Sequence, residues 1–388
     1  MTIILAAMSE ATLENLSLIL LLGIPISLTL LLHYLFGIHR VQERWPPGLA
    51  LGAGNALGLG LCVALLSAGG ELYFRFAVDT TDAFGVTKIT RRWLNRHYQL
   101  NSAGMRDDLE YAVTRPPGLR RITFVGDSFS AGYGIPDVED RFANLIRARR
   151  PGWEVHVLAD NGWNTGAHVG LLGSQAAYEL DFVVLVYGLN DISDIDPAWE
   201  VMRERLYETG QPSSFFTLHS YLFNTLHYRW VAFRSRDLGD YYLQNRDAYA
   251  SELWKAQRKR LKYFAQRVRE RGGRLAVITF PFLHAVGPDY AYQPVHDQLG
   301  KFWIRLDVPH LDLLSLYADR DPHELVVNAH DTHPNEYAHE MAATAILPFL
   351  DSWTTRPAPS SALRPPPAPP GDPLPEQPAA AAASQASP

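Results

Sequence analysis

Two long uncharged runs within the first 70 residues constrain the fold most strongly. No Asp, Glu, Lys or Arg occurs between residues 15 and 39. A helix over residues 16–38, rising about 1.5 Å per residue, is long enough to cross a hydrocarbon layer of about 30 Å. A second uncharged run covers residues 45–70. After an N-terminal segment of residues 1–14, we therefore expect a membrane region over residues 15–70, with transmembrane helices at about 16–38 and 47–69.

Small residues in the second run indicate that the two helices pack as a hairpin. Gly48 with Gly52, and Gly54 with Gly58, are spaced four residues apart, which lets helix backbones approach closely. A buried helix of a soluble domain is the alternative for this run. A cleaved signal peptide is not expected, because no basic segment precedes the first run.

The distribution of cations predicts an orientation. The connection HRVQER carries Arg40 and Arg44, whereas the segment before the first run has no Lys or Arg. The positive-inside rule places this connection in the cytoplasm and the rest of the chain outside, beginning with a connecting region over residues 71–117. Cations beyond the second run favour the opposite orientation: Arg75, Lys88, Arg91 and Arg92.

Composition excludes several classes of function. Cys62 is the only cysteine, so an intrachain disulfide is impossible and a cysteine-rich metal site is not expected. The formal net charge of −6 disfavours nucleic acid as a partner. Residues 353–388 are rich in proline and alanine, and we expect them to form a disordered tail.

Between these ends, short apolar runs alternate with amphipathic stretches. The short runs are rich in β-branched and aromatic residues and predict buried strands at residues 121–126, 153–160, 180–188 and 274–280. Helices are expected at Val138–Arg149, at Ala250–Arg271 and from about Asn335 to Leu350. This alternation predicts a parallel α/β sheet with helices on both faces, whose ligands bind beyond the carboxyl ends of the strands.

Ser128, in FVGDSFSAGYG, follows the first of these strands by two residues. A serine hydroxyl is a poor nucleophile unless a base accepts its proton and hydrogen-bond donors receive the oxyanion. The third strand ends in GLND, where the Asn190 amide could donate to an oxyanion, and the second is followed by NGWNTG, where Gly162 could offer its backbone N–H. Near the end of the domain, DTHPN supplies His333 as a base, with Asp331 nearby to orient it.

In this order, the motifs GDSFS, NGWNT, GLND and DTHPN resemble the four blocks of the SGNH/GDSL-family hydrolases. The resemblance covers about residues 118–352. It implies a three-layer α/β/α (flavodoxin-like) domain and a bacterial serine esterase that uses no cofactor. The stretch QLNSAGMRDDLEY before the first strand is similar to that of membrane-anchored bacterial members, in which an N-terminal membrane region precedes the hydrolase domain. Together with the orientation predicted from the cations, we expect a multi-pass protein of the inner membrane with a periplasmic catalytic domain.

The resemblance also implies roles for individual residues. Ser128 would attack an acyl carbonyl, with its own N–H, the Gly162 N–H and Asn190 as oxyanion donors and His333 as the proton shuttle. One departure concerns the acid. The family usually places it three residues before the histidine, where this chain has His330, whereas Asp331 stands two before. If Asp331 does not serve, the site is a Ser–His dyad or another acid such as Asp321 substitutes.

Several alternatives stay open at the level of sequence. The crowding of His330, Asp331, His333 and His339 would suit a metal, although no HExxH-type pairing is present. An O-acyltransferase would use the same serine site, with a sugar hydroxyl in place of water. The aromatic-rich insert over residues 192–249 would suit a lid or a lipid-contacting surface, and hence a lipase or thioesterase. A non-catalytic binding protein is the last alternative. The favoured substrate is an O-acetyl ester on a cell-envelope polysaccharide.

Overall fold

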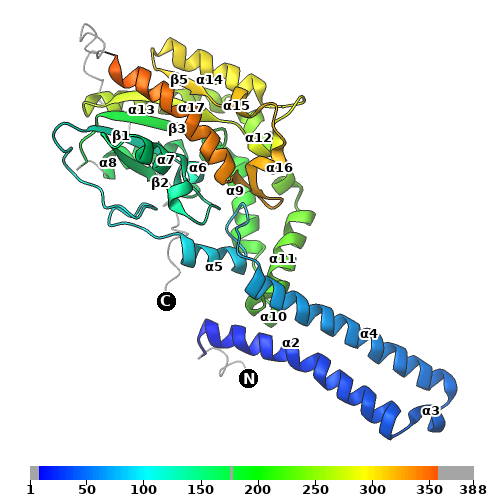
Figure 1. Cartoon of the computed structure of the whole chain (residues 1–388). Helices are drawn as coiled ribbons and strands as arrows, with labels where there is room; N and C mark the ends of the chain where they lie inside the picture. Colours follow the sequence, from blue (N-terminus) through cyan, green and yellow to red (C-terminus); the bar gives the residue numbers. More distant parts are fainter. Residues whose placement is uncertain (1–7, 175–177, 357–388) are drawn as a thin grey trace. The chain divides into compact units, whose positions relative to one another are not determined.

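The structure, a computed structural model, describes residues 8–174 and 178–356. A five-stranded parallel sheet with the order β2-β1-β3-β4-β5 forms its centre (Figure 1). The strands are β1 (Arg120–Gly126), β2 (Trp153–Ala159), β3 (Phe182–Gly188), β4 (Arg274–Phe280) and β5 (His310–Asp312). Because β1 lies between β2 and β3, the chain leaves β1 at the point where the strand order reverses. Parallel α/β sheets bind their ligands beyond such a point.

Helices cover both faces of this sheet, as the alternation of side chains along each strand requires. On one face, Phe124 of β1 packs with α7 (Phe142–Arg149) and α17 (Glu336–Thr355). On the other face, Val125 packs with α8 (Thr165–Ser174), α13 (Leu253–Glu270) and α14 (Gln293–Arg305). The predicted three-layer α/β/α fold is therefore confirmed.

The four predicted strands are confirmed, and the structure adds two features. The first is β5, a strand too short to be distinguished by its pattern. The second is an antiparallel pair made by β6 (Val326–Asn328) and β7 (Asp331–Pro334). His333 thus lies in a strand immediately before α17. The stretch expected to be helical from residue 138 begins with a 3₁₀ turn, Val138–Asp140, and α7 follows it.

Two N-terminal helices are long and apolar enough to cross a membrane: Glu10–Ile38 and Pro47–Ala77. The first is α2 (Glu10–Leu32) with a π-helical end, and the second is α4 (Pro47–Leu72) with another. Only 17% and 11% of their most apolar windows are buried within the protein, unlike the core helix of a soluble domain. They fit the predicted spans. Of the four glycines expected at the contact between the two helices, only Gly54 lies against the other helix, at Phe36. Gly60, which was not among them, lies against Leu28. A Cβ at Gly48, Gly52 or Gly58 would meet open space.

The insert between β3 and α13 is helical. Its helices are α9 (Pro197–Glu204), α10 (Phe215–His219), α11 (Tyr221–Arg234) and α12 (Arg236–Tyr249). The remaining helices are α3 (Val41–Arg44), α5 (Lys88–His97), α6 (Ser128–Ala131), α15 (Leu314–Tyr317) and α16 (Pro322–Leu325). The tail was expected to begin at residue 353, but α17 runs to Thr355 and buries Trp353. Residues 357–388 of the expected tail and the first seven residues of the chain lie outside the described residues.

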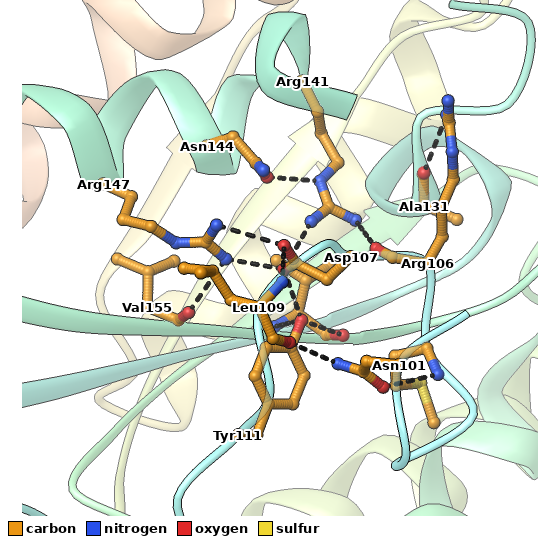
Figure 2. A network of polar contacts seen from close by, with 12 residues as sticks. Asn101, Arg106, Asp107, Leu109, Tyr111, Ala131, Arg141, Asn144, Arg147 and Val155 are labelled. Atoms are coloured by element: carbon orange, nitrogen blue, oxygen red, sulfur yellow. Dashed lines mark hydrogen bonds and ion pairs between the residues drawn. The ribbon is translucent and has the colours of Figure 1, made fainter. Parts of the chain in front are cut away.

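A buried network attaches the connecting region to the sheet domain (Figure 2). The carboxylate of Asp107 accepts hydrogen bonds from Arg141 at 2.9 Å, from Arg147 at 2.6 Å and from the hydroxyl of Tyr111 at 2.6 Å. Burial alone would raise the pKa of Asp107, but the hydrogen bonds and charges of these partners lower it well below its usual range. The folded protein therefore holds the Asp107 side chain as a carboxylate.

We predict that Asp107→Asn destabilises the protein by about 3–5 kcal/mol, because it leaves two arginines near a neutral amide in a buried place. Urea unfolding of the full chain in detergent, followed by tryptophan fluorescence at neutral pH, measures this. Asp108→Asn is the matched control, since Asp108 is adjacent but exposed. Equal unfolding midpoints for the two variants would contradict the importance of the network.

Candidate active site

Ser128 stands at the start of α6, directly beyond the carboxyl end of β1. The carboxylate of Asp127 caps this short helix by accepting a hydrogen bond from the Phe129 N–H at 3.0 Å. Gly126 is required by space, since a Cβ there would come within 2.2 Å of the Ser130 hydroxyl oxygen and 3.0 Å of the Val186 carbonyl oxygen. The turn that presents Ser128 is therefore tight and capped.

His333 connects Ser128 with Asp331. Its Nε2 lies 2.8 Å from Ser128 Oγ, and its Nδ1 lies 2.5 Å from Asp331 Oδ1. The same carboxylate oxygen accepts a hydrogen bond from the His333 backbone N–H at 3.1 Å. With a proton on Nδ1, His333 donates to Asp331 and can accept the Ser128 proton at Nε2, which is the arrangement that a serine nucleophile needs.

The two-residue spacing between acid and histidine follows from the local structure. Residues two apart in a strand point to the same face, and Asp331 and His333 both belong to β7. His330 precedes this strand and is exposed. Asp321 caps α16 by accepting from the His323 N–H. Among Asp331, His330 and Asp321, it is therefore Asp331 that contacts the imidazole of His333.

The surroundings of His333 favour its protonated form. Burial opposes the charge, but the charge and hydrogen bond of Asp331, helped by Asp127 and Asp82, raise the pKa of His333 above its ordinary value. The rings of Tyr133 and Phe129 pack against the imidazole, with centroids 4.7 and 5.5 Å away. The position of the His333 ring is thus fixed by these aromatic contacts as well as by the hydrogen bonds of its two nitrogens.

Gly162 and Asn190, the expected oxyanion donors besides Ser128, lie just beyond the ends of the strands that flank β1. Gly162 follows β2 with a φ of 73°, and a Cβ built on it would meet open space. Asn190 follows β3, where a Cβ added to Gly188 would meet both the Asn190 Oδ1, at 2.7 Å, and the Asp127 Oδ2, at 3.0 Å. Asn190 therefore lies beside the residue that precedes Ser128. Because the strands are parallel, Gly162, Asn190 and Ser128 lie at the same edge of the sheet.

Burial shifts the pKa of three groups beneath this edge. Burial raises the pKa of Asp127 to about 6, against the lowering effects of the Phe129 N–H, the His333 charge and the Asn190 amide. Burial, together with the charges of Asp127 and Asp194, raises the pKa of Asp191 well above its usual range. Burial lowers the pKa of His168 to about 3. Of these buried groups, Asp127 adds to the effect of Asp331 in raising the pKa of His333.

Two of the histidines considered for the alternative of a metal site make other contacts. Both ring nitrogens of His333 are engaged with Ser128 and Asp331, and His339 is buried against the Phe142 N–H. Within residues 8–174 and 178–356, the group of three close metal-binding side chains is Asp107, Asp108 and Glu139, on the connecting region and the 3₁₀ turn before α7.

Three contacts at the site escaped sequence reasoning. The Thr81 hydroxyl donates to Asp331 Oδ2. The Tyr242 hydroxyl lies 2.5 Å from Thr332 Oγ1, so α12 reaches the strand of the histidine. Burial raises the pKa of Tyr241, against the lowering effect of hydrogen bonds with Asn245, Ser193 and Asn190. No motif marks these residues, and only the folded chain brings them to the site.

Comparison with known proteins identifies the family. The model of the GDSL-like lipase/acylhydrolase family matches residues 124–341, which include Ser128, Gly162, Asn190, Asp331 and His333. The chain belongs to this family and is an ester-hydrolysing enzyme. A search of curated proteins finds no match to it.

Among solved structures, the chain is similar to a lipolytic protein of the G-D-S-L family from Veillonella parvula, with 14% identity over 59% of this chain and 97% of that one and a TM-score of 0.38. An acetylxylan esterase from Geobacillus stearothermophilus shows 13% identity over 60% of this chain and 94% of that one, with a TM-score of 0.37. A two-domain esterase active on acetylated mannans shows 17% identity over 65% of this chain and 54% of that one, with a TM-score of 0.36.

The raised pKa of His333 predicts the pH dependence of the enzyme. The imidazole has to be neutral to accept the serine proton, so kcat/KM for a short-chain ester should rise with pH through an ionisation above the ordinary histidine value of about 6.5. Asp331→Asn removes the charge that raises this pKa. We expect it to move the ionisation to lower pH and to lower kcat by on the order of 10³- to 10⁴-fold.

The matched control is Asp321→Asn, because asparagine caps a helix about as well as aspartate and Asp321 is exposed. It should keep both the rate and the pH profile of the parent. If the pH profile of Asp331→Asn showed the same ionisation as that of the parent, another group would set the pKa of His333.

Proposed function

We propose that this chain is a membrane-anchored serine esterase that removes O-acetyl groups from a cell-envelope polysaccharide through an acyl-enzyme on Ser128. The observation that carries the proposal is the chain of hydrogen bonds from Ser128 Oγ through His333 to Asp331. These residues come from a strand end and from a hairpin 205 positions away. Nothing in local sequence requires them to meet.

The geometry supports a two-step mechanism. As Ser128 Oγ bonds to the acyl carbon, its proton passes to His333 Nε2, and Asp331 stabilises the imidazolium that forms. The oxyanion receives hydrogen bonds from the Ser128 N–H, the Gly162 N–H and the Asn190 amide. The intermediate then collapses, and the alcohol leaves with the proton from His333. Water then attacks the acyl carbon of the acyl-enzyme while His333 Nε2 takes its proton. The second intermediate collapses, the acid is released, and Ser128 Oγ regains the proton from His333.

The proposed setting follows from the N-terminal helices. Two spans, Glu10–Ile38 and Pro47–Ala77, would hold the hydrolase domain, residues 118–352, at the membrane, with residues 71–117 between them. The cations at Arg40 and Arg44 favour an extracytoplasmic domain. An enzyme held there meets envelope polysaccharides, whose acetyl esters are the substrate that we propose.

A lipid acyl ester is the second candidate, and one surface favours it. On α11, Leu226, Trp230 and Phe233 are exposed by 46%, 57% and 82% of their area and share one helix face through their spacing of four and three residues. Exposed aromatic side chains beside a membrane are typical of lipid contact. An O-acyltransferase would use the same catalytic residues, with a sugar hydroxyl in place of water.

Purified full-length protein in detergent tests these functions. Acetylated xylan, acetylated peptidoglycan fragments and p-nitrophenyl esters of increasing chain length are the substrates, and released acid is measured. We expect the fastest turnover with acetyl esters. A maximum at long acyl chains would select the lipid ester, and transfer to an added oligosaccharide faster than hydrolysis would select the acyltransferase. Ser128→Ala should abolish turnover, and unchanged turnover in this variant would refute the serine mechanism.

The role of Asn190 can be measured in the same assay. Asn190→Ala should lower kcat by about 10²- to 10³-fold, the usual effect of removing one oxyanion donor. Asn95→Ala is the control, because Asn95 is exposed on α5, and it should keep the parental rate. A fall of less than about threefold in Asn190→Ala would remove this residue from the oxyanion hole.

A further inference from the structure

We infer that Thr81, which lies between the second apolar helix and the sheet domain, is a positioning residue for the catalytic acid. Its hydroxyl donates a hydrogen bond to Oδ2 of Asp331. The inference rests on the proposed roles of Asp331 and His333. It extends the active site to a segment that lies outside the residues matched by the family model, 124–341.

The need for this contact follows from the burial of Asp331. The residue is fully buried, and its Oδ1 already accepts from the ring and from the backbone N–H of His333. A buried carboxylate oxygen without a donor is costly. The Thr81 hydroxyl supplies that donor at Oδ2, so the carboxylate is held through both of its oxygens and cannot rotate away from the imidazole.

Thr81 is itself held beside the β6–β7 hairpin. The side-chain amide of Asn328 donates to the Thr81 carbonyl at 3.0 Å and to Thr80 Oγ1 at 2.9 Å. The Ala83 N–H donates to the His330 carbonyl at 3.0 Å. These contacts flank Asp331 on both sides of the hairpin turn, so the segment behaves as a third element packed alongside the two strands.

The loop beyond Ser128 leaves room for this segment. Gly134 has a φ of 93°, and a Cβ there would come within 2.5 Å of Val327 and 3.2 Å of Thr81 Oγ1. The Tyr133 hydroxyl donates to the Asp82 carbonyl at 2.9 Å, while the Tyr133 ring packs against His333. The nucleophile loop, the histidine and the Thr81 segment therefore meet at one place.

The segment is fixed at its other end near the second apolar helix. The guanidinium of Arg92 donates to the carbonyls of Phe74, Arg75 and Val78, where the π-helical end at Tyr73–Ala77 finishes. The Asp82 carboxylate accepts from the N–H groups of Phe84 and Val86 at 3.1 and 3.2 Å. Thr81 thus stands four residues beyond the end of the proposed membrane span, in backbone that is hydrogen-bonded on both sides.

Two substitutions separate the hydroxyl from the packing of Thr81. Thr81→Val keeps the shape and removes the donor, whereas Thr81→Ser keeps the donor and removes a methyl group. In the full chain in detergent, with a p-nitrophenyl acetate assay, we expect Thr81→Val to lower kcat roughly 10- to 100-fold, the effect of losing a hydrogen bond to a charged group. KM should stay the same. Thr81→Ser should remain within about threefold of the parent.

Thr80→Val is the matched control, since the Thr80 hydroxyl bonds to Asn328 and not to Asp331. It should keep the parental kcat. The inference is overturned if Thr81→Val keeps kcat within about twofold, if Thr81→Ser loses as much as Thr81→Val, or if Thr80→Val loses as much. Melting temperatures of all three variants distinguish a loss of folding from a loss of positioning.

A measurement without substrate separates this inference from the proposed function. The low-field proton resonance of His333 Nδ1–H reports the hydrogen bond to Asp331. It should move in Thr81→Val and stay in place in Thr80→Val. If the parent turns over no ester, the proposed function fails, but this resonance still tests the role of Thr81. A resonance that does not move in Thr81→Val overturns the inference, and one that moves supports it.

Discussion

The hydrogen bond between Ser128 Oγ and His333 Nε2 joins residues 205 positions apart, and much of the fold contributes to making it. The parallel sheet brings the end of β1 to the point where the strand order reverses. The hairpin of β6 and β7 and the start of α17 return the chain to that edge. Asp127 caps the turn that presents the serine, and aromatic rings pack against the histidine.

Features carried by continuous segments could be predicted from the sequence. The four long strands have seven residues each, most of them apolar, so their pattern is local. Ser128, Gly162, Asn190 and His333 each follow a strand or precede a helix, and parallel strands bring such positions to one edge. The spacing of Asp331 departs from the three residues that are usual in the family. It brings the acid to His333 because residues 331–334 form a strand, in which residues two apart share a face.

Features that depend on distant pairing could not be predicted in this way. The strand β5 has only three residues. The short strands β6 and β7 form only because they pair with each other. Thr81 reaches Asp331 across 250 positions and Tyr242 reaches Thr332 across 90. Neither residue has a motif, because a single hydroxyl donor requires no neighbours in the sequence. Of the four glycines of α4 expected to contact the other helix, Gly54 does so, whereas Gly48, Gly52 and Gly58 have open space. Four-residue spacing does not say which side of a helix faces its partner.

The central claim is that Ser128 is a nucleophile activated by His333. Mass spectrometry of the intact full-length protein after treatment with a fluorophosphonate tests it directly, with peptide mapping of the adduct. The account predicts one adduct per chain, on the peptide that contains Ser128, and much slower labelling after His333→Ala. An adduct on another residue, or labelling of His333→Ala at the parental rate, would contradict it.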